Sequence, residues 1–242
     1  MKTTNRTTEV SDLQVIYEDN HLIAINKRPG DIVQGDKTGD EPLGEVVKRY
    51  LKDKYSKPGQ VFLGVIHRLD RPVSGLVIFA RTSKALTRMN AMFQKREIQK
   101  TYWAIVSGEP LRSAVLNDYL KKNESQNKSY SVPEGTKGAK PAELNYSLKG
   151  KGDRYAFLEV KPVTGRHHQI RAQLSTADLI IKGDVKYGAR RPEKDASICL
   201  HSRMAAFIHP VSKEKMEFVA EAPNGNIWQA FSNIEQAPSL KD

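Results

Sequence analysis

The chain has 242 residues, a length that suits one large domain or one domain with small lobes. Lysine and arginine total 39 against 28 acidic residues, and this formal charge of +11 favours nucleic acid as a partner, although a generic solubility charge would look the same. The single cysteine excludes an intrachain disulfide and favours a reducing compartment, for which we expect the cytoplasm. No apolar stretch approaches the roughly 18–20 residues that span a bilayer, and the polar start carries no secretory signal, so we expect no membrane contact.

Apolar periodicity divides the first hundred residues into short strands and helices. In residues 42–54, for example, Leu43, Val46, Val47 and Leu51 recur at helical spacing. The predicted order is a polar tail over 1–12, a hairpin over 13–27 with its turn at Asp19 and Asn20, a helix over 42–54, strands over 61–66 and 75–80, and a helix capped by Thr82 or Ser83.

The remainder of the chain continues this mixed pattern, without internal repeats or regular strand–helix alternation. The predicted order is a strand over 101–106, a mobile loop or irregular hairpin over 121–141, a strand over 155–160, a helix that follows Thr164 and Gly165 and runs to about 176, strands over 198–203 and 215–220, and a frayed tail after Ser232. We therefore expect an α+β protein.

Asp70 lies in the most informative segment, VIHRLDRPVSGLVIFA over residues 65–80. Arg68 and Asp70 stand there between two predicted strands, and charged residues held between apolar strands are rigidly positioned, as a functional site requires. A tight turn in which Asp70 bonds its own backbone and Arg71-Pro72 sets the bend explains the pattern equally well. The residues alone leave both interpretations open.

A second basic cluster is PVTGRHHQIRAQL, residues 162–174. Thr164 and Gly165 are expected to cap a helix that places Arg166 and Arg171 near its start, where a solvated basic helix end is the alternative. The adjacent histidine pair invites a metal site, but the positions three and four residues further on hold no ligand and the chain has no cysteine cluster. We expect no metal.

These stretches together resemble the RluA-type family of pseudouridine synthases. HRLDRPVSGL is similar to the family's catalytic signature, and TGRHHQIRAQL, about 100 residues later, is similar to its second block. Lys100, Thr101 and Tyr102 resemble its K-x-Y strand, and GDVKYG over 183–188 followed by LHSRMAAFIHPVSKE over 200–214 resembles its closing segment. The likeness covers roughly residues 13–222.

The resemblance implies a pseudouridine synthase-like α+β fold, with a mixed, mainly antiparallel sheet, flanking helices and a central RNA-binding cleft. We expect one catalytic domain over 13–232, with tails over 1–12 and 233–242, and without the N-terminal RNA-binding module of many relatives. Val73 stands where the family has threonine, a change between β-branched side chains that the turn should tolerate. Residues 142–144 depart from the family's usual Ala-x-Thr.

The implied activity is the isomerisation of uridine to pseudouridine in RNA, which needs neither an organic cofactor nor a metal. The resemblance assigns Asp70 as the catalytic carboxylate, acting either as a nucleophile or as a base. Arg171 matches the family arginine that pairs with this aspartate, and an arginine partner favours the ionised carboxyl. Tyr102 matches the family's active-site tyrosine, whose ring would stack on the detached uracil. His67 matches a position with a structural role.

The target nucleotide of a stacked RNA must be extruded before an enzyme reaches it. Arg68 matches the family position that enters the RNA where the base was, and pairing with an internal acid is the alternative for this side chain. Arg166 and Lys100 are candidates for phosphate contacts.

We expect the partner to be ribosomal or transfer RNA and the protein to act as a monomer. A catalytically silent RNA-binding protein of the same fold is the alternative function, and a nuclease is disfavoured because no compact acid cluster adjoins either basic stretch.

Overall fold

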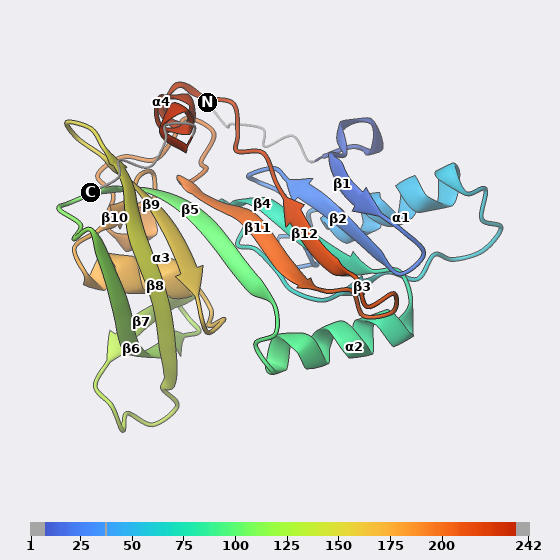
Figure 1. The fold of residues 1–242 in the computed structure, drawn as a ribbon, viewed down its shortest axis with the longest axis horizontal. Coiled ribbons are helices and arrows are strands. Elements are labelled where there is room, and N and C mark those ends of the chain that lie inside the picture. Colours follow the sequence, from blue (N-terminus) through green and yellow to red (C-terminus); the bar gives the residue numbers. More distant parts are fainter. Residues whose placement is uncertain (1–7, 37, 236–242) are drawn as a thin grey trace. The chain divides into compact units, whose positions relative to one another are not determined.

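The computed structural model describes residues 8–36 and 38–235 (Figure 1). The described chain forms two compact units. Unit 1 contains residues 8–36, 38–100, 194–197 and 201–221, and unit 2 contains residues 101–193, 198–200 and 222–235. No helix in the described part is long and apolar enough to cross a membrane.

Unit 1 is built on strands ordered β1-β2-β4-β11-β12, with β3 also paired to β4. All of these pairs are antiparallel except β4 with β11, which is parallel at Ser74 and Gly75. The elements are β1 (Val15–Glu18), β2 (Leu22–Lys27), α1 (Leu43–Lys54), β3 (Gly64–Val65), β4 (Ser74–Ala80), α2 (Ser83–Gln94), β11 (Leu200–Ile208, its first residue in unit 2) and β12 (Lys215–Val219).

The core of unit 1 forms because β4 is apolar on both faces. Every residue of this strand is buried, and α2 packs against it through Ala85 and Met89. The Thr82 hydroxyl accepts a hydrogen bond from the Ala85 amide at 3.2 Å, which confirms the predicted helix start. Gly75 has a φ of +109°, and a Cβ on it would lie 2.3 Å from the Ser202 carbonyl oxygen. Only glycine therefore allows β4 to approach β11 here.

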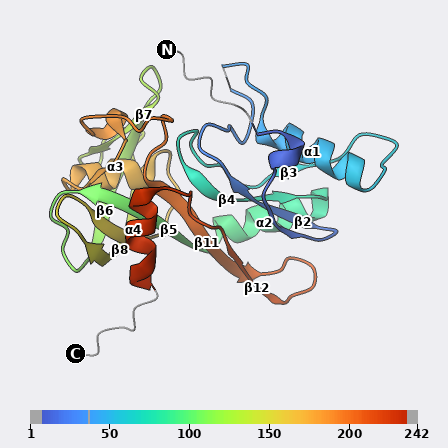
Figure 2. The same cartoon turned by 90° about the horizontal axis from the view of Figure 1, so that it is seen from above.

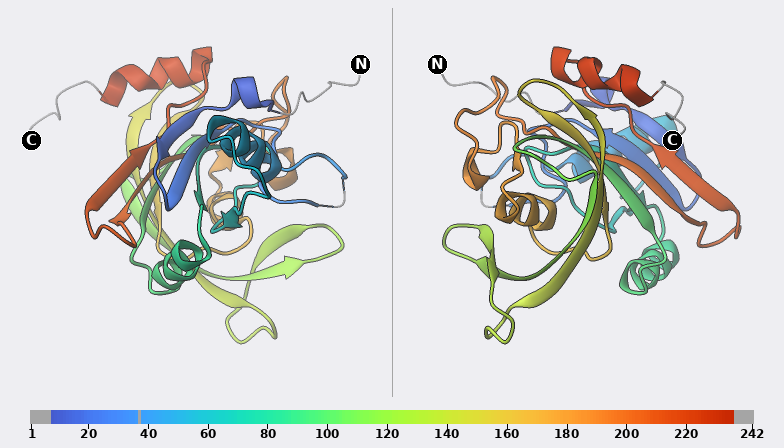
Figure 3. Two further views of the ribbon diagram at one scale, coloured as in Figure 1. Left: turned by 90° about the vertical axis from the view of Figure 1, so that its right-hand side faces the viewer. Right: turned by 60° about the vertical axis from the view of Figure 1, so that its left-hand side comes forward.

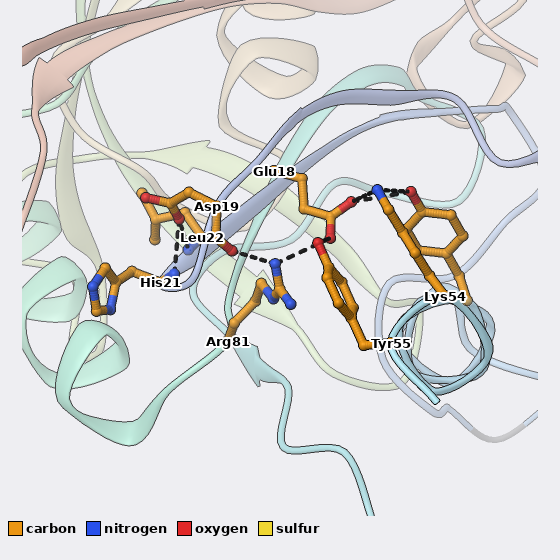
Figure 4. Close-up of polar contacts among 8 residues, drawn as sticks. Glu18, Asp19, His21, Leu22, Lys54, Tyr55 and Arg81 are labelled. Atoms are coloured by element: carbon orange, nitrogen blue, oxygen red, sulfur yellow. Dashed lines mark hydrogen bonds and ion pairs between the residues drawn. The ribbon is translucent and has the colours of Figure 1, made fainter. Parts of the chain in front are cut away.

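A buried carboxylate ties β1 to α1 within unit 1 (Figure 4). Glu18 accepts hydrogen bonds from the Tyr50 hydroxyl at 3.0 Å, the Tyr55 hydroxyl at 2.6 Å and the Lys54 ammonium at 2.8 Å. The Arg81 guanidinium donates to the same carboxylate at 3.0 Å and lies 4.8 Å from the Tyr55 ring centroid. Burial raises the pKa of Glu18, but the bonds from Lys54 and the tyrosines outweigh it, so the pKa is lowered.

Unit 2 contains a purely antiparallel run of strands ordered β5-β9-β8-β6-β7, with the short β10 also paired to β5. Figure 3 shows β6 and β8, drawn from green to yellow, as long curved strands. The elements are β5 (Gln99–Ser107, its first two residues in unit 1), β6 (Ser113–Asn123), β7 (Lys128–Val132), β8 (Lys140–Lys151), β9 (Ala156–Pro162), α3 (Gln169–Thr176), β10 (Ile180–Ile181), a 3-10 turn (Val185–Tyr187) and α4 (Asn226–Glu235).

Two helices pack on these strands. The helix α3 packs against β6 and β7 (Figure 2), where Ala172 joins Leu120 in a small buried cluster. The helix α4 packs against β8 and stacks Phe231 on Phe157, with ring centroids 5.7 Å apart. The α+β class with mainly antiparallel pairing is therefore confirmed, while the predicted central cleft stays a prediction.

Several predicted boundaries differ from the structure. The strand predicted over 61–66 is only Gly64–Val65, and residues 121–141 form the β6–β7 hairpin and the start of β8, so the hairpin alternative holds. The tail predicted after Ser232 is wrong as far as Glu235, because α4 continues to that residue. Residues 236–242 and 1–7 of the predicted tails lie outside the described residues.

Residues 8–12, the described part of the predicted N-terminal tail, are structured and contact the rest of unit 1. Thr8 donates to the Asp31 carboxylate from its amide at 3.0 Å and from its hydroxyl at 2.6 Å, and Val10–Asp12 forms a 3-10 turn. The candidate site residues fall in both units. The expectation of one catalytic domain over 13–232 stays a prediction.

Candidate active site

Asp70 lies in unit 1 on a tight turn between β3 and β4. Its backbone carbonyl accepts a hydrogen bond from the Val73 amide at 3.0 Å, which closes the turn around Arg71 and Pro72. The Asp70 side chain is half-buried. The predicted turn is therefore present, and the fully buried strand β4 that follows it gives the carboxylate a rigid base.

Lys27 supports this Asp70 turn, residues 70–73, from the interior of unit 1. Its side chain is fully buried, and its ammonium donates to the backbone carbonyls of Arg28 at 2.8 Å and Arg71 at 3.2 Å. Burial lowers the pKa of Lys27 to about 7, and the Asp31 and Asp70 carboxylates oppose this shift. The Lys27 amino group in the interior of unit 1 thus holds the backbone next to Asp70, and the Asp70 carboxylate favours its charged form.

Arg71 connects the same turn to an acidic loop. Its guanidinium donates to the Asp40 carboxylate at 2.6 Å and to the Thr38 hydroxyl at 2.7 Å, and it lies 3.6 Å from the Asp36 carboxylate. The Arg71 carbonyl also accepts from the Gly30 amide at 2.8 Å. Backbone and side chain of Arg71 therefore fix the turn to two points of the loop that joins β2 to α1.

His67 has the structural role that we expected from its position. Its Nε2 accepts a hydrogen bond from the Ile78 amide at 3.0 Å, and its ring stacks on Phe93 with centroids 5.2 Å apart. Burial and, to a smaller extent, the charge of nearby Lys100 lower the pKa of His67 to about 4. The ring is therefore neutral at physiological pH and anchors the strand before Asp70 to β4.

A second buried histidine anchors the far side of the Asp70 turn. His201 Nε2 lies 3.0 Å from the Ala220 carbonyl oxygen, so Nε2 carries the proton and Nδ1 accepts from the Ser74 hydroxyl at 2.9 Å. Burial lowers the pKa of His201 to about 4. Both side chains are almost inaccessible, so this pair is a structural link and does not form a nucleophilic site.

The two predicted RNA contacts of unit 1 differ in environment. Arg68 is exposed, and no residue in the described part of the chain forms a hydrogen bond or ion pair with its guanidinium. The predicted alternative of an internal ion pair with Asp70 is therefore not what the structure has. The Lys100 ammonium lies 5.8 Å from the Phe93 ring centroid, and burial lowers its pKa.

Arg171 lies in unit 2 on α3, where it is buried. Its Nε and Nη2 atoms donate to the two carboxylate oxygens of Asp184 at 2.7 and 2.8 Å, and only 5% of the Arg171 side chain and 1% of the Asp184 side chain are exposed. The Tyr187 ring centroid lies 4.9 Å from the guanidinium carbon. This two-bond pair fixes the orientation of the guanidinium plane.

The histidines before α3 tie this helix to the β6–β7 hairpin. His167 and His168 stack with ring centroids 3.8 Å apart. The Ser129 hydroxyl lies 2.9 Å from His167 Nδ1, and the Tyr187 hydroxyl lies 3.0 Å from His168 Nδ1. The Ser129 amide also donates to the Tyr187 hydroxyl at 2.9 Å. The histidine pair thus takes part in a hydrogen-bond network with the hairpin.

The predicted start of this helix directly after Thr164 and Gly165 is wrong, since α3 begins at Gln169, after His168 in a left-handed conformation with φ of 53°. The Thr164 hydroxyl accepts from the Glu143 amide at 2.9 Å and donates to the Gln169 side chain at 2.7 Å, so it is not available as a cap. The Arg166 amide donates to the same Gln169 oxygen at 2.9 Å. A contact with the backbone of Glu143, 21 residues earlier in sequence, therefore occupies the hydroxyl that was expected to cap the helix.

The other two predicted site residues of unit 2 are Tyr102 and Arg166. Tyr102 lies on β5, half-buried, opposite Val160 of β9. Arg166 precedes α3 and donates from Nε to the Pro141 carbonyl at 2.9 Å. The six predicted site residues thus form two groups, Asp70, Arg68 and Lys100 in unit 1 and Tyr102, Arg166 and Arg171 in unit 2.

Sequence reasoning missed three residues that shape these groups, namely Lys27, Asp184 and Tyr187. Asp184 and Tyr187 belong to GDVKYG, a block noticed only as part of the family pattern, and its single acid was the available signal. Lys27 carries a signal of its own, because it is a charged residue in the strand that begins with the apolar run LIAI over 22–25. Among the described residues, no group of three His, Cys, Asp or Glu side chains is arranged to hold a metal ion.

Comparison with known proteins gives a consistent picture. Residues 21–176 match the family model described as RNA pseudouridylate synthase. A ribosomal large subunit pseudouridine synthase C from Vibrio vulnificus is 32% identical over 228 residues, which cover 91% of this chain and 68% of that protein. A tRNA pseudouridine synthase C from Vibrio parahaemolyticus is 32% identical over 244 residues, which cover 93% of this chain and 96% of that protein.

A solved structure shares the fold. Human RNA Pseudouridylate Synthase Domain Containing 4 aligns with a TM-score of 0.74 and 22% identity, covering 92% of this chain and 93% of that chain. The family model matches more than half of this chain, and the two bacterial relatives are pseudouridine synthases over most of its length. The chain therefore belongs to the RNA pseudouridylate synthase family, as an RluA-type pseudouridine synthase and hence an isomerase.

Proposed function

We propose that this enzyme converts uridine to pseudouridine in structured ribosomal or transfer RNA, with Asp70 as its catalytic carboxylate. The similar proteins named above are described as acting on the large ribosomal subunit or on tRNA. The observation that carries the assignment is the Asp70 turn, where a half-buried carboxylate stands on a backbone fixed by Lys27, Arg71 and β4. A rigid acid of this kind suits a reaction that needs one positioned carboxylate.

The proposed reaction is an isomerisation in which atoms balance within the nucleotide. The bond from ribose C1′ to uracil N1 breaks, the uracil turns, and a bond from C1′ to C5 forms while C5 loses a proton and N1 gains one. Asp70 acts as the nucleophile at C1′ or as the base that removes a ribose proton. Tyr102 is the proposed stacking partner of the detached uracil.

Arg171 is proposed to favour the ionised form of the Asp70 carboxyl. A guanidinium close to a carboxylate stabilises its negative charge where the carboxylate is partly desolvated. The pair with Asp184 contributes orientation to this role, because it holds the guanidinium in one plane in a buried position. Arg171→Ala is expected to lower turnover far more than RNA affinity, and an equal fall in both would make Arg171 a binding residue only.

Base flipping gives the proposed enzyme access to the target uridine. Extruding a stacked nucleotide costs a few kcal/mol, which contacts to the vacated space and to phosphates offset. Arg68 is the proposed residue for the vacated space because its guanidinium is exposed and none of the described side chains pairs with it. Arg166 and Lys100 are proposed phosphate contacts.

The experiment is a pseudouridine map of total RNA from cells that contain or lack the gene. We expect specific pseudouridines in ribosomal or transfer RNA to disappear on deletion, to return with the wild-type gene, and to stay absent with Asp70→Asn. Asp53→Asn, on the exposed face of α1, is the matched control and should restore them. Unchanged maps after deletion, together with RNA binding by the purified protein, would support the silent RNA-binding alternative.

A further inference from the structure

A basic cleft lies in unit 1, away from the Asp70 turn along the chain. It has a volume of about 320 Å³ and lies between the C-terminal half of α2 and the turn that joins β11 to β12. None of its lining residues is one of the six proposed site residues, although Ile208, Pro210 and Lys213 belong to the closing block of the family pattern. The lining residues are Arg88, Ala91, Met92, Lys95, Glu97, Ile208, Pro210 and Lys213.

Two of the cations in this cleft converge on one neutral oxygen. The Arg88 guanidinium donates to the Pro210 carbonyl at 2.9 Å, and the Lys213 ammonium donates to the same oxygen at 3.2 Å. In the part of the chain that the structure describes, neither Arg88, Lys213 nor Lys95 forms an ion pair with a carboxylate. Arg88 and Lys213 therefore lie close together without an ion-paired carboxylate, an arrangement that a bound anion stabilises.

The local charges of the cleft favour an anion even when its negative groups are included. Three cations line the cleft against the single carboxylate of Glu97, which leaves two positive charges in excess. The C-terminal end of α2 contributes the equivalent of about half a negative charge, which reduces this excess without reversing it. Met92 and Ile208 add apolar surface, and 44% of Ile208 is exposed. Cations beside apolar surface match the phosphates and sugar edges of a nucleic-acid strand.

We propose that this α2–β12 cleft binds backbone phosphates of the RNA substrate outside the target uridine. The inference rests on the proposed function, because it takes RNA as the partner. Lys95 and Lys213 are its contacts from the two sides of the cleft, and Arg88 holds the turn that carries Lys213 through their shared carbonyl. These residues bind RNA without touching the reacting nucleotide.

The test is the salt dependence of RNA binding by Lys95→Gln/Lys213→Gln. Both side chains are exposed, so the variant should fold. The matched control is Lys52→Gln/Lys57→Gln, which removes two exposed cations of unit 1 outside the cleft. Affinity for unmodified transfer RNA and large-subunit ribosomal RNA transcripts is measured by filter binding between about 50 and 200 mM salt.

We expect the slope of log affinity against log salt to fall by about 2 in the cleft variant and to keep its wild-type value in the control. With a modifiable transcript, KM should rise while kcat stays unchanged. A cleft variant with the wild-type slope and KM overturns the inference, and an acidic protein partner would then be the occupant to examine. Binding is measured without turnover, so an enzyme that formed no pseudouridine would refute the proposed function but leave this test valid.

Discussion

Replacement of Lys27 by methionine tests the link between the interior cation and the Asp70 turn. Burial lowers the pKa of Lys27 from its ordinary 10.5 to about 7. Between these values the unfolded chain holds a proton that the folded protein has released, so stability rises with pH across this window. Between pH 7 and pH 9 this group should contribute a rise of about 2 kcal/mol to the free energy of unfolding.

Lys27→Met has no proton to release and should lose this rise. Urea unfolding at pH 7, 8 and 9 measures the effect, and other titrating groups cancel in the comparison with the wild type. Lys52→Met, at an exposed position of α1, is the control and should keep the wild-type pH dependence. The variant should also turn over more slowly, because the Arg71 carbonyl loses its ammonium donor. A methionine variant with the full pH-dependent rise would refute the reasoning.

Three further substitutions test single contacts. Asp184→Asn leaves the buried Arg171 without its charged partner and should destabilise the protein by about 3–5 kcal/mol in urea unfolding, and a loss under 1 kcal/mol would contradict the pair's importance. Glu18→Gln should lower the free energy of unfolding by about 1–3 kcal/mol at pH 7. Because the pKa of Glu18 is lowered in the folded protein, the difference from the wild type should shrink as acid protonates the carboxylate. A difference that did not change with pH would count against this explanation. Gly75→Ala should lower the melting temperature markedly, because its Cβ would clash with the Ser202 carbonyl, and an unchanged melting temperature would show that β4 and β11 can separate at no cost.

Much of unit 1 was predictable from local patterns. The apolar stripe of α1, the Thr82 cap of α2 and the apolar run of β4 each carry their signal within a dozen residues. The parallel pairing of β4 with β11 was not predictable in this way, because its partners lie more than 120 residues apart in sequence. Local periodicity reports which residues are buried but not which distant strand covers them.

Unit 2 shows where local reasoning failed. The start of α3 depends on the Thr164 hydroxyl, whose contact with Glu143 spans about twenty residues and removes the expected cap. The C-terminal helix α4 was not predicted, and its end at 233–235 was taken for a frayed tail, although Phe231 of this helix packs on Phe157 of β9. In both cases a tertiary contact decides the outcome over local preference.

The candidate site shows the same division. Asp70, Tyr102 and Arg171 were identified through a family resemblance, because short motifs in a fixed order can be recognised in the sequence alone. Asp184 was missed because a carboxylate thirteen residues from Arg171 becomes its partner only when the chain folds. The turn around Asp70 was anticipated as an alternative to a catalytic role, and the structure shows that the turn exists. A tight turn and a catalytic carboxylate are compatible, because the turn supplies the rigidity that the carboxylate needs.

The most direct test of the central claim follows the hydrogen at C5 of the target uridine. Purified wild-type enzyme and Asp70→Asn are incubated with transcripts that carry tritium at C5 of uridine, and released tritium is counted. We predict release by the wild type and none above background by Asp70→Asn, with the affinity of the variant for the same RNA unchanged. Release by the variant at a rate close to that of the wild type would show that another group performs the chemistry.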